Sequence, residues 1–213
     1  MTTLRITEIF YSLQGEANTV GIPTVFIRLT GCPLRCVYCD SAYAFTGGKK
    51  MTIADIINEV KQYNCQYITV TGGEPLAQAA SLELMKQLAD LGYKISLETS
   101  GALDVSGVDS RVIKVIDLKT PDSGEQQKNH YQNLDHITAQ DQLKFVISSD
   151  KDYQWSKNII EQHQLLGRCE ILFSPVAGQQ NPTELAEKIL SDRLPVRFQI
   201  QLHKLLWGDV QGK

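Results

Sequence analysis

Short apolar runs alternate with helical segments along most of this chain. Runs rich in β-branched residues, which are typical of buried strands, occupy residues 25–29, 67–71, 94–98, 112–117, 142–147, 170–173 and 196–202. Between these runs, helices are predicted at residues 53–64, 82–91, 153–164 and 181–195. Strands that alternate with helices in this way predict βαβ units and a parallel sheet.

Several of the predicted helices carry local signals at their ends. Thr52 and Asp55 have the spacing of a capping box, and Gly92 follows its helix as a typical stop. Asn181 and Pro182 fit the N-cap and first position of the last helix, which Pro195 is expected to end. These signals set the predicted helix boundaries.

The number of units bounds the fold. A chain of 213 residues is long enough for one domain with a full core, so a single domain is expected over residues 1–213. About six βα units are too few for a closed eightfold barrel. The pattern therefore predicts an α/β fold built as a partial (β/α)6 barrel with mostly parallel strands.

Composition excludes several classes of protein. The net charge is −3, which gives no reason to expect a nucleic-acid partner, and no apolar stretch approaches the length of a membrane span. The first residues contain no apolar segment typical of a secretory signal. Five cysteines is an odd number, and three of them are clustered, which favours a reducing cytoplasm and a metal cluster over a disulfide framework.

The three clustered cysteines are the most specific chemical signal. Cys32, Cys36 and Cys39 lie on one short loop directly after the first predicted strand. A structural zinc site or an electron-transfer 4Fe–4S cluster takes four ligands, whereas a cubane held by three thiolates leaves one iron open for chemistry. A zinc site completed by Cys65, Cys169 or a histidine is the alternative, although both of these cysteines are expected to pack in the core.

Polar and glycine-rich segments follow four further strands. They are Thr71-Gly72-Gly73-Glu74-Pro75, Glu98-Thr99-Ser100-Gly101, Asp117-Leu118-Lys119-Thr120-Pro121 and Ser174-Pro175-Val176. Each has an ordinary interpretation, as a turn or as a surface ion pair. Parallel barrels, however, place their sites at the carboxyl ends of the strands, so these segments and the cysteine loop are predicted to converge on one face.

A polar segment also precedes the first predicted strand, and Arg28 lies within that strand. These residues could form a surface loop and a snorkelling arginine. An arginine inside an apolar strand nevertheless needs an anionic partner, and arginine binds carboxylates in a bidentate manner. Gln14 and Glu16 add donors and acceptors suited to the edge of a heterocycle.

The cysteine spacing, with an aromatic residue before the last cysteine, resembles the signature of the radical S-adenosylmethionine (SAM) superfamily. A narrower resemblance, over residues 8 to about 207, is to the 7-carboxy-7-deazaguanine synthase family. The segments that carry it are Ser-Leu-Gln-Gly-Glu, Phe-Ile-Arg-Leu-Thr-Gly-Cys, Asp40-Ser41, Thr-Gly-Gly-Glu-Pro, Glu-Thr-Ser-Gly, Asp-Leu-Lys-Thr-Pro and Gln201-Leu202-His203-Lys204. The resemblance implies a radical SAM barrel that is a homodimer and converts 6-carboxy-5,6,7,8-tetrahydropterin to 7-carboxy-7-deazaguanine with loss of ammonia, a step toward queuosine. It also implies a 4Fe–4S cluster, catalytic use of SAM, support by Mg²⁺ and a partner protein that supplies electrons.

The resemblance assigns roles residue by residue. The cluster ligands would be Cys32, Cys36 and Cys39, with Tyr38 facing the adenine of SAM. Ser41 would bind Mg²⁺ at a position where the family usually carries threonine. Contacts to SAM are expected from Gly73, Glu74, Glu98, Ser100, Asp117, Leu118, Lys119, Ser174, Pro175, Val176 and Ala177. Contacts to the substrate are expected from Leu13, Gln14, Gly15, Glu16, Arg28, Thr71 and His203.

Two other functions fit parts of the sequence. An activase that places a glycyl radical on a protein partner has the same cysteine spacing, but the Leu-Gln-Gly-Glu segment and Asp40-Ser41 speak against it. A non-enzymatic zinc or iron–sulfur module predicts a fourth cysteine ligand and gives the glycine segments no function. Residues 207–213 match no motif that assigns them a function.

Overall fold

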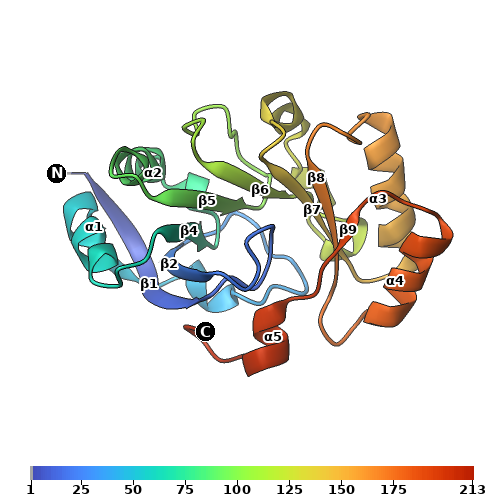
Figure 1. The fold of residues 1–213 in the computed structure, drawn as a ribbon, viewed down its shortest axis with the longest axis horizontal. Coiled ribbons are helices and arrows are strands. Elements are labelled where there is room, and N and C mark those ends of the chain that lie inside the picture. The colour runs from blue at the N-terminus through green and yellow to red at the C-terminus, as the bar shows by residue number, and fades with distance from the viewer. Residues whose placement is uncertain (1) are drawn as a thin grey trace.

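The computed structural model describes residues 2–213, and within them nine strands form one sheet in the order β3-β1-β2-β4-β5-β6-β7-β8-β9 (Figure 1). The strands are β1 (Thr3–Leu13), β2 (Pro23–Leu29), β3 (Lys49–Thr52), β4 (Tyr67–Gly72), β5 (Lys94–Thr99), β6 (Ile113–Asp117), β7 (Gln142–Ile147), β8 (Glu170–Pro175) and β9 (Arg197–Phe198). From β2 to β9 all neighbouring strands pair in parallel, while β1 pairs antiparallel with both β2 and β3. The sheet is open at both edges, which confirms the prediction of an α/β fold with a partial, mostly parallel barrel.

Within residues 2–213, four of the five α-helices lie between strands, as βαβ units require, and the fifth follows the last strand. The helices are α1 (Ile53–Lys61), α2 (Ala80–Asp90), α3 (Asp150–Gln162), α4 (Pro182–Ser191) and α5 (Leu202–Trp207). The crossover from β5 to β6 is a loop, and the next one consists of short 3-10 turns at residues 121–123, 126–128 and 131–136. In Figure 1, α1 and α2 flank one end of the sheet and α3 and α4 the other. The central strands therefore have a thinner cover than the outer ones.

The helix boundaries follow side-chain capping. Thr52 and Asp55 form the predicted capping box, and the side chain of Asn181 accepts hydrogen bonds from the backbone at the start of α4. The prediction that α4 extends to Pro195 is wrong, because the helix ends at Ser191 and Arg193 adopts a left-handed conformation with φ of 51°. α3 starts three residues earlier than predicted because Ser149 caps it.

The N-terminal segment differs from the prediction. Residues 3–13 were expected to precede the first strand, yet they form the 11-residue strand β1. A register shift between Ile6 and Glu8 interrupts the alternation of buried and exposed positions there. A bulge of this kind bends the strand and re-aims the side chain that follows it, which hides the strand period from the sequence.

The C-terminal prediction is also partly wrong. A strand was expected over residues 196–202, but only Arg197–Phe198 pair with β8, and the short helix α5 follows. The side chain of Gln199 makes two hydrogen bonds to the backbone of Ala17. Its Oε1 accepts from the Ala17 N–H at 2.6 Å, and its Nε2 donates to the Ala17 carbonyl at 2.8 Å. The loop after β1 thus joins the last strand and bridges the open side of the barrel.

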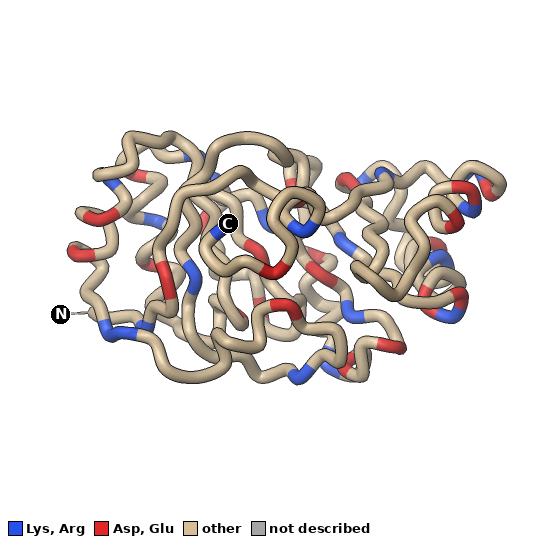
Figure 2. The backbone as a smooth tube through the Cα atoms, turned by 90° about the horizontal axis from the view of Figure 1, so that it is seen from below, with Lys and Arg blue, Asp and Glu red and all other residues tan. Residues whose placement is uncertain are grey.

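The core lies between the sheet and its helices. Its fully buried members include Val25, Ile27 and Leu29 of β2 and Leu143 and Phe145 of β7. Over residues 2–213, acidic and basic residues are interspersed, and no large region carries charges of one sign only (Figure 2). In the described residues no helix is both long and apolar enough to cross a membrane.

Candidate active site

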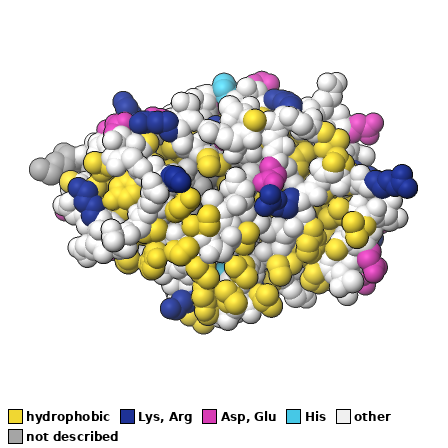
Figure 3. All heavy atoms as spheres, viewed as in Figure 1, with side chains coloured by type: hydrophobic (Ala, Val, Ile, Leu, Met, Phe, Trp, Pro, Cys, Tyr) yellow, Lys and Arg dark blue, Asp and Glu magenta, His cyan; other side chains and the backbone are white. Residues whose placement is uncertain are grey.

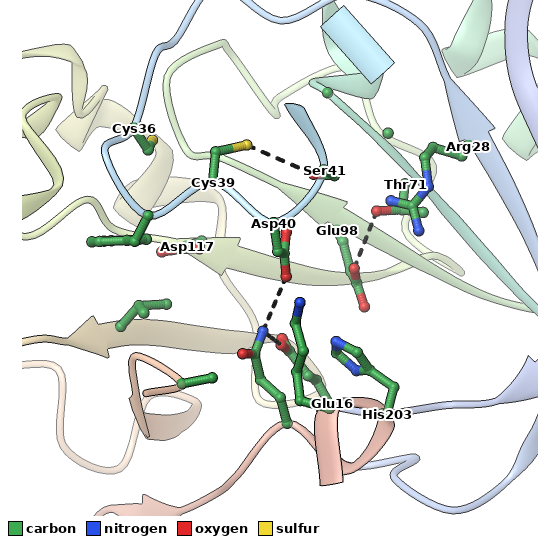
Figure 4. Close-up of a pocket in the computed structure, with 18 of the residues that line it drawn as sticks. Glu16, Arg28, Cys36, Cys39, Asp40, Ser41, Thr71, Glu98, Asp117 and His203 are labelled. Atoms are coloured by element: carbon green, nitrogen blue, oxygen red, sulfur yellow. Dashed lines mark hydrogen bonds between the residues drawn. The ribbon is translucent and has the colours of Figure 1, made fainter. Parts of the chain in front are cut away.

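A cavity of about 920 Å³ opens at the carboxyl ends of the parallel strands. Its walls include the cysteine loop and segments after β1, β4, β5, β6 and β8. This is the face on which the sequence motifs were predicted to converge. We name two parts of the cavity after the contacts predicted for them. The cofactor end is lined by the cysteine loop and the segments after β4 and β6, and the substrate end is lined by residues 13–16, Arg28 and residues 201–213. Figure 4 shows Cys36 and Cys39 apart from Arg28 and Glu98, with Asp40 between them.

The cysteine loop presents three free thiols to the cofactor end. Cys32, Cys36 and Cys39 are partly buried and line the cavity. Burial raises the pKa of the Cys36 thiol to about 11, so a bound metal must supply the charge that stabilises its thiolate. The backbone N–H of Leu34 points to the Cys32 sulfur at 3.4 Å, a donor typical of sulfur ligands.

These thiols fit an iron–sulfur cluster better than a single zinc ion. Cys65 bonds the carbonyl of Pro23, and Cys169 lies just before β8; neither lines the cavity. Both cysteines pack against the core, as predicted. Among the described residues no three His, Cys, Asp or Glu side chains converge on one point for a metal ion. Three thiolates that each bind a different iron of a cubane do not need to converge on one point.

Two glycines bring the β4 loop against the cysteine loop. A Cβ atom on Gly73 would lie 2.3 Å from the carbonyl oxygen of Gly31, and one on Gly72 would lie 2.3 Å from that of Leu29. Gly72 also has a φ of 153°, in the region that favours glycine. The sequence therefore uses glycine here because only a bare backbone fits between the two segments.

Glu74 has its polar atoms turned into the protein. Its carboxylate is fully buried, does not line the cavity, and accepts hydrogen bonds from the hydroxyl of Thr99, the backbone and hydroxyl of Ser100, and the backbone of Leu76. In this geometry Glu74 orders the β5 end, including Ser100, which does line the cavity. A direct contact from Glu74 to SAM stays a prediction.

The segment after β6 contributes an ion pair at the cofactor end. Lys119 Nζ lies 2.9 Å from Asp117 Oδ2, and neighbouring anionic groups keep the pKa of Lys119 above its ordinary value despite its burial. Asp117 Oδ1 is buried and has no hydrogen-bond partner among the described residues. A buried acceptor without a partner is costly, so this atom fits a donor on a bound ligand. Tyr38 lines the same region, and burial raises its pKa to about 12.

Arg28 has its anionic partner inside the protein. Its Nε donates to Glu8 Oε1 at 2.7 Å, and the same oxygen accepts from the Tyr43 hydroxyl at 2.7 Å. The guanidinium also lies over the rings of Phe10 and Tyr43, at 5.8 and 5.7 Å. The bulge in β1 sets this register, in which Glu8 pairs with Arg28 across the strands. The other guanidinium nitrogens take no part in these bonds, which suits them to a carboxylate in the cavity.

The barrel interior holds a second set of acidic groups. Glu98 accepts from the Thr71 hydroxyl at 3.1 Å and from the Gln14 amide at 3.3 Å, so its carboxylate lies beside the substrate end (Figure 4), and the contact to SAM expected for Glu98 stays a prediction. Burial and the nearby Glu16 carboxylate raise the pKa of Glu98. Gln14 Nε2 also donates to the hydroxyl of Thr69 at 2.9 Å, so the side-chain amide nitrogen of Gln14 already has partners within the protein.

Lys144 is a site residue that sequence reasoning missed. It lines the cavity from the inner face of β7 and pairs with Glu16. Burial alone would raise the pKa of Glu16, but the Lys144 ammonium outweighs it and holds that pKa below its ordinary value. The argument that singled out Arg28, a charge inside an apolar strand, applies equally to Lys144.

The C-terminal segment closes the substrate end. Gln201 Nε2 donates to Glu16 at 2.7 Å and to Asp40 at 3.2 Å (Figure 4). His203 packs against Gly15, and its burial lowers its pKa, which favours the neutral imidazole. Residues 208–213, to which the sequence assigned no function, also line the cavity.

The remaining predicted contacts divide into two groups. Leu13, Gly15, Thr71, Gly73, Val176 and Ala177 line the cavity, whereas Leu118, Ser174 and Pro175 do not. The Leu118 side chain belongs to the core, and its backbone N–H donates to the backbone carbonyl of Lys144. Ser174 and Pro175 form the end of β8. Ser41 lines the cavity with its hydroxyl 3.9 Å from the Cys39 sulfur, and its binding of Mg²⁺ stays a prediction.

Comparison with known proteins agrees with this geometry. Residues 26–119 match the model of the radical SAM superfamily. The 7-carboxy-7-deazaguanine synthase of Chlorobaculum tepidum is 45% identical, over 98% of this chain and 97% of its own length. That of Koribacter versatilis is 40% identical, over 96% and 97%.

Solved structures support the fold. The crystal structure of QueE from Escherichia coli matches with a TM-score of 0.79 over 94% of this chain and 95% of its own, at 21% identity. Streptococcus suis SuiB bound to S-adenosylmethionine matches with a TM-score of 0.54 over 83% and 47%, at 13% identity. The structures show the fold, and the full-length sequence relatives show the family. With three thiols and a polar substrate end in one cavity, this chain belongs to the 7-carboxy-7-deazaguanine synthase family of radical SAM enzymes.

Proposed function

We propose that this protein is a carbon–nitrogen lyase that converts 6-carboxy-5,6,7,8-tetrahydropterin to 7-carboxy-7-deazaguanine and ammonia. The observation that carries the proposal is a single cavity that joins the Cys32–Cys39 loop to a set of polar groups suited to an anionic heterocycle. The change is redox-neutral overall, because the product and ammonia together contain all the atoms of the substrate. A cofactor that is used catalytically therefore suffices.

The cofactor end fits a 4Fe–4S cluster and SAM. The three cysteines would hold the cluster, while Asp117 Oδ1 and the backbone beside Gly73 would take donors on SAM. When bound, this group supplies hydrogen-atom abstraction that no side chain can perform. The protein positions the two ligands and, through α5 and residues 208–213, limits access of water to the cavity.

The substrate end fits the pterin and its carboxylate. Arg28, held in place by Glu8, would bind the carboxylate. Glu16, kept ionised by Lys144 and oriented by Gln201, would accept from N–H groups on the heterocycle. Thr71 and Glu98 line the same wall, and His203 covers it from the opposite side.

Three further assignments are proposals that rest on the family resemblance. Ser41 would ligate Mg²⁺ together with the substrate, a reductant protein would donate to the cluster, and the protein would act as a homodimer in the cytoplasm. Exposed apolar side chains gather along the lower edge in Figure 3, where α5 lies in Figure 1. Leu205 and Leu206 of α5 are exposed, as is Val210 in the segment that follows the helix. A monomer measured by light scattering at micromolar concentration would remove the dimer from the proposal.

An anaerobic turnover assay tests the function. Reconstituted protein receives SAM, a reductant, Mg²⁺ and 6-carboxytetrahydropterin, and 7-carboxy-7-deazaguanine is followed by mass. We expect SAM-dependent product that disappears in Cys36→Ala and persists in Cys65→Ala, a matched cysteine outside the cavity. Formation of 5′-deoxyadenosine and methionine without product would overturn the substrate assignment and keep the superfamily. A colourless protein that contains zinc would favour a binding module.

A further inference from the structure

Lys144 occupies an unusual position inside the barrel. Leu143, Phe145 and Ile147 of β7 are fully buried in the core, so Lys144 lies on the opposite, inner face of the strand. Its side chain is 13% exposed and lines the cavity. A lysine ammonium is rarely placed in such surroundings without paired anions, because its desolvation is costly.

The ammonium lies between carboxylates from the two ends of the cavity. Lys144 Nζ hydrogen bonds to Glu16 at the substrate end and lies 3.8 Å from Asp117 Oδ2 at the cofactor end. Glu16 is oriented from its other side by Gln201 at 2.7 Å. Asp117 is paired with Lys119, and its Oδ1 has no hydrogen-bond partner within residues 2–213. Lys144 is thus a charged contact shared by both ligand sites.

We propose that Lys144 is a positioning residue that couples the binding of SAM to the binding of the pterin. The inference rests on the proposed function, because it takes these two molecules as the ligands. A donor of SAM on Asp117 reduces the negative charge that attracts Lys144 toward the cofactor end. The ammonium then pairs more strongly with Glu16, which fixes the acceptor that the pterin needs. By linkage, the pterin must tighten SAM by the same factor.

A second buried lysine provides a matched control. Lys114, on the neighbouring strand β6, is 4% exposed and pairs with Asp141 at 2.9 Å. It does not line the cavity, whereas Val115 and Asp117 of the same strand do. Loss of either lysine leaves a buried carboxylate without its partner, so both changes should destabilise the fold. Of these two lysines, only Lys144 contacts both the cofactor end and the substrate end of the cavity.

The test measures binding by the cluster-loaded protein under anaerobic conditions. The Kd of SAM is determined with and without 6-carboxytetrahydropterin for wild type, Lys144→Met, Lys144→Arg and Lys114→Met. We expect the pterin to tighten SAM about fivefold or more in wild type, within the usual range of coupling. The factor should fall to about 1 in Lys144→Met, recover in part in Lys144→Arg, and stay at the wild-type value in Lys114→Met. If Lys144→Met does not fold, Glu16→Gln breaks the same pair from the other side and should lose the same coupling.

Two results would overturn the inference. One is an unchanged coupling factor in Lys144→Met, or in Glu16→Gln where the first variant does not fold. The other is the absence of coupling in wild type. Product formation by the wild type, measured separately, keeps the two proposals apart. If the wild type forms product but shows no coupling, only the proposal for Lys144 is rejected. If the wild type binds SAM but forms no product, the proposed reaction is rejected.

Discussion

The two ends of the cavity are built in different ways. The cofactor end comes from one continuous part of the chain, the residues 26–119 that match the superfamily model, and close backbone contacts at Gly72 and Gly73 hold it together. The substrate end joins segments that are far apart in sequence. Its bonds run from Gln201 to Glu16, from the Leu202 backbone to Gly15, and from Lys144 to Glu16.

This difference indicates which part of the fold defines which function. The cofactor end does not depend on how the sheet edges meet, because its contacts lie within residues 26–119. The substrate end depends on the bridge between the loop after β1 and Gln199. Changes at the substrate end should therefore affect pterin binding and leave the binding of SAM without pterin intact, while changes at the cofactor end should affect the binding of both.

Arg28→Ala should have the largest selective effect. Loss of a buried, hydrogen-bonded cation that faces an anionic ligand typically costs about 2–5 kcal/mol, which corresponds to roughly 30-fold or more in affinity. We expect pterin binding and product formation to fall by that factor while slow SAM cleavage continues. Kinetics of both products in the same assay measure the split.

Two variants control for this result. Arg28→Lys keeps the charge but loses both the Nε–H that donates to Glu8 and the planar fork that would bind the ligand carboxylate, so it should recover only part of the affinity. Arg197→Ala removes an arginine that pairs with Glu170 outside the cavity and should leave both activities unchanged. Normal pterin affinity in Arg28→Ala would show that the carboxylate binds elsewhere.

Gly73→Ala should damage the cofactor end. The added methyl would meet backbone at 2.3 Å, and overpacking of this kind costs about 1–3 kcal/mol of stability. We expect SAM affinity to fall at least about tenfold, measured by equilibrium dialysis, together with a lower free energy of unfolding. Gly107→Ala, whose methyl would meet only the side chain of Leu82 at 3.2 Å, should do neither. Unchanged SAM binding in Gly73→Ala would mean that the β4 loop can move away from the cysteine loop without a loss of SAM affinity.

Gly15→Ala should disturb the substrate end more mildly. A Cβ atom there would lie 2.2 Å from His203 Nδ1, and that side chain can move aside. Pterin affinity should fall by up to about tenfold with SAM affinity unchanged. In Gly15→Ala/His203→Ala the contact at 2.2 Å with the imidazole is removed and only the contact at 3.2 Å with the Cβ of position 203 remains, so the double variant should bind pterin nearly like His203→Ala alone. An equal loss of SAM affinity in Gly15→Ala would contradict the separation of the two ends.

Much of the cofactor end could be predicted from the sequence, because its motifs directly follow apolar strands. The substrate end was harder to predict. The bulge before Glu8 concealed β1 and with it the partner of Arg28. No residue of helix α5 is fully buried and His203 is only partly buried, so no periodic pattern marks the helix, and its place over the cavity depends on contacts with the distant Gly15. The sequence also could not predict the direction in which a side chain points. Glu74 faces the protein interior, although its neighbour Gly73 lines the cavity.

The smallest effect expected is a difference in pH dependence between two neighbouring carboxyl groups. Burial raises the pKa of Glu98 above its ordinary value of 4.5. Above pH 4.5 the folded state therefore holds a proton that the unfolded state has released, and stability falls as the pH rises through the folded pKa. Glu98→Gln removes this loss, so it should unfold at a Tm about 2–4 °C higher than wild type at pH 8, for roughly 1 kcal/mol, with a smaller difference at pH 5.

Glu16 should behave in the opposite way. Lys144 outweighs the effect of burial and lowers the pKa of Glu16, so this carboxylate adds stability above pH 4.5 that is lost as the pH falls through its folded value. Glu16→Gln should therefore lower the Tm at pH 8, because it leaves the Lys144 ammonium without its partner. Thermal unfolding of wild type, Glu98→Gln and Glu16→Gln at pH 5 and pH 8 gives the Tm difference between each variant and wild type at each pH. Shifts of the same sign in both variants at pH 8 would mean that Lys144 does not distinguish the two carboxyl groups.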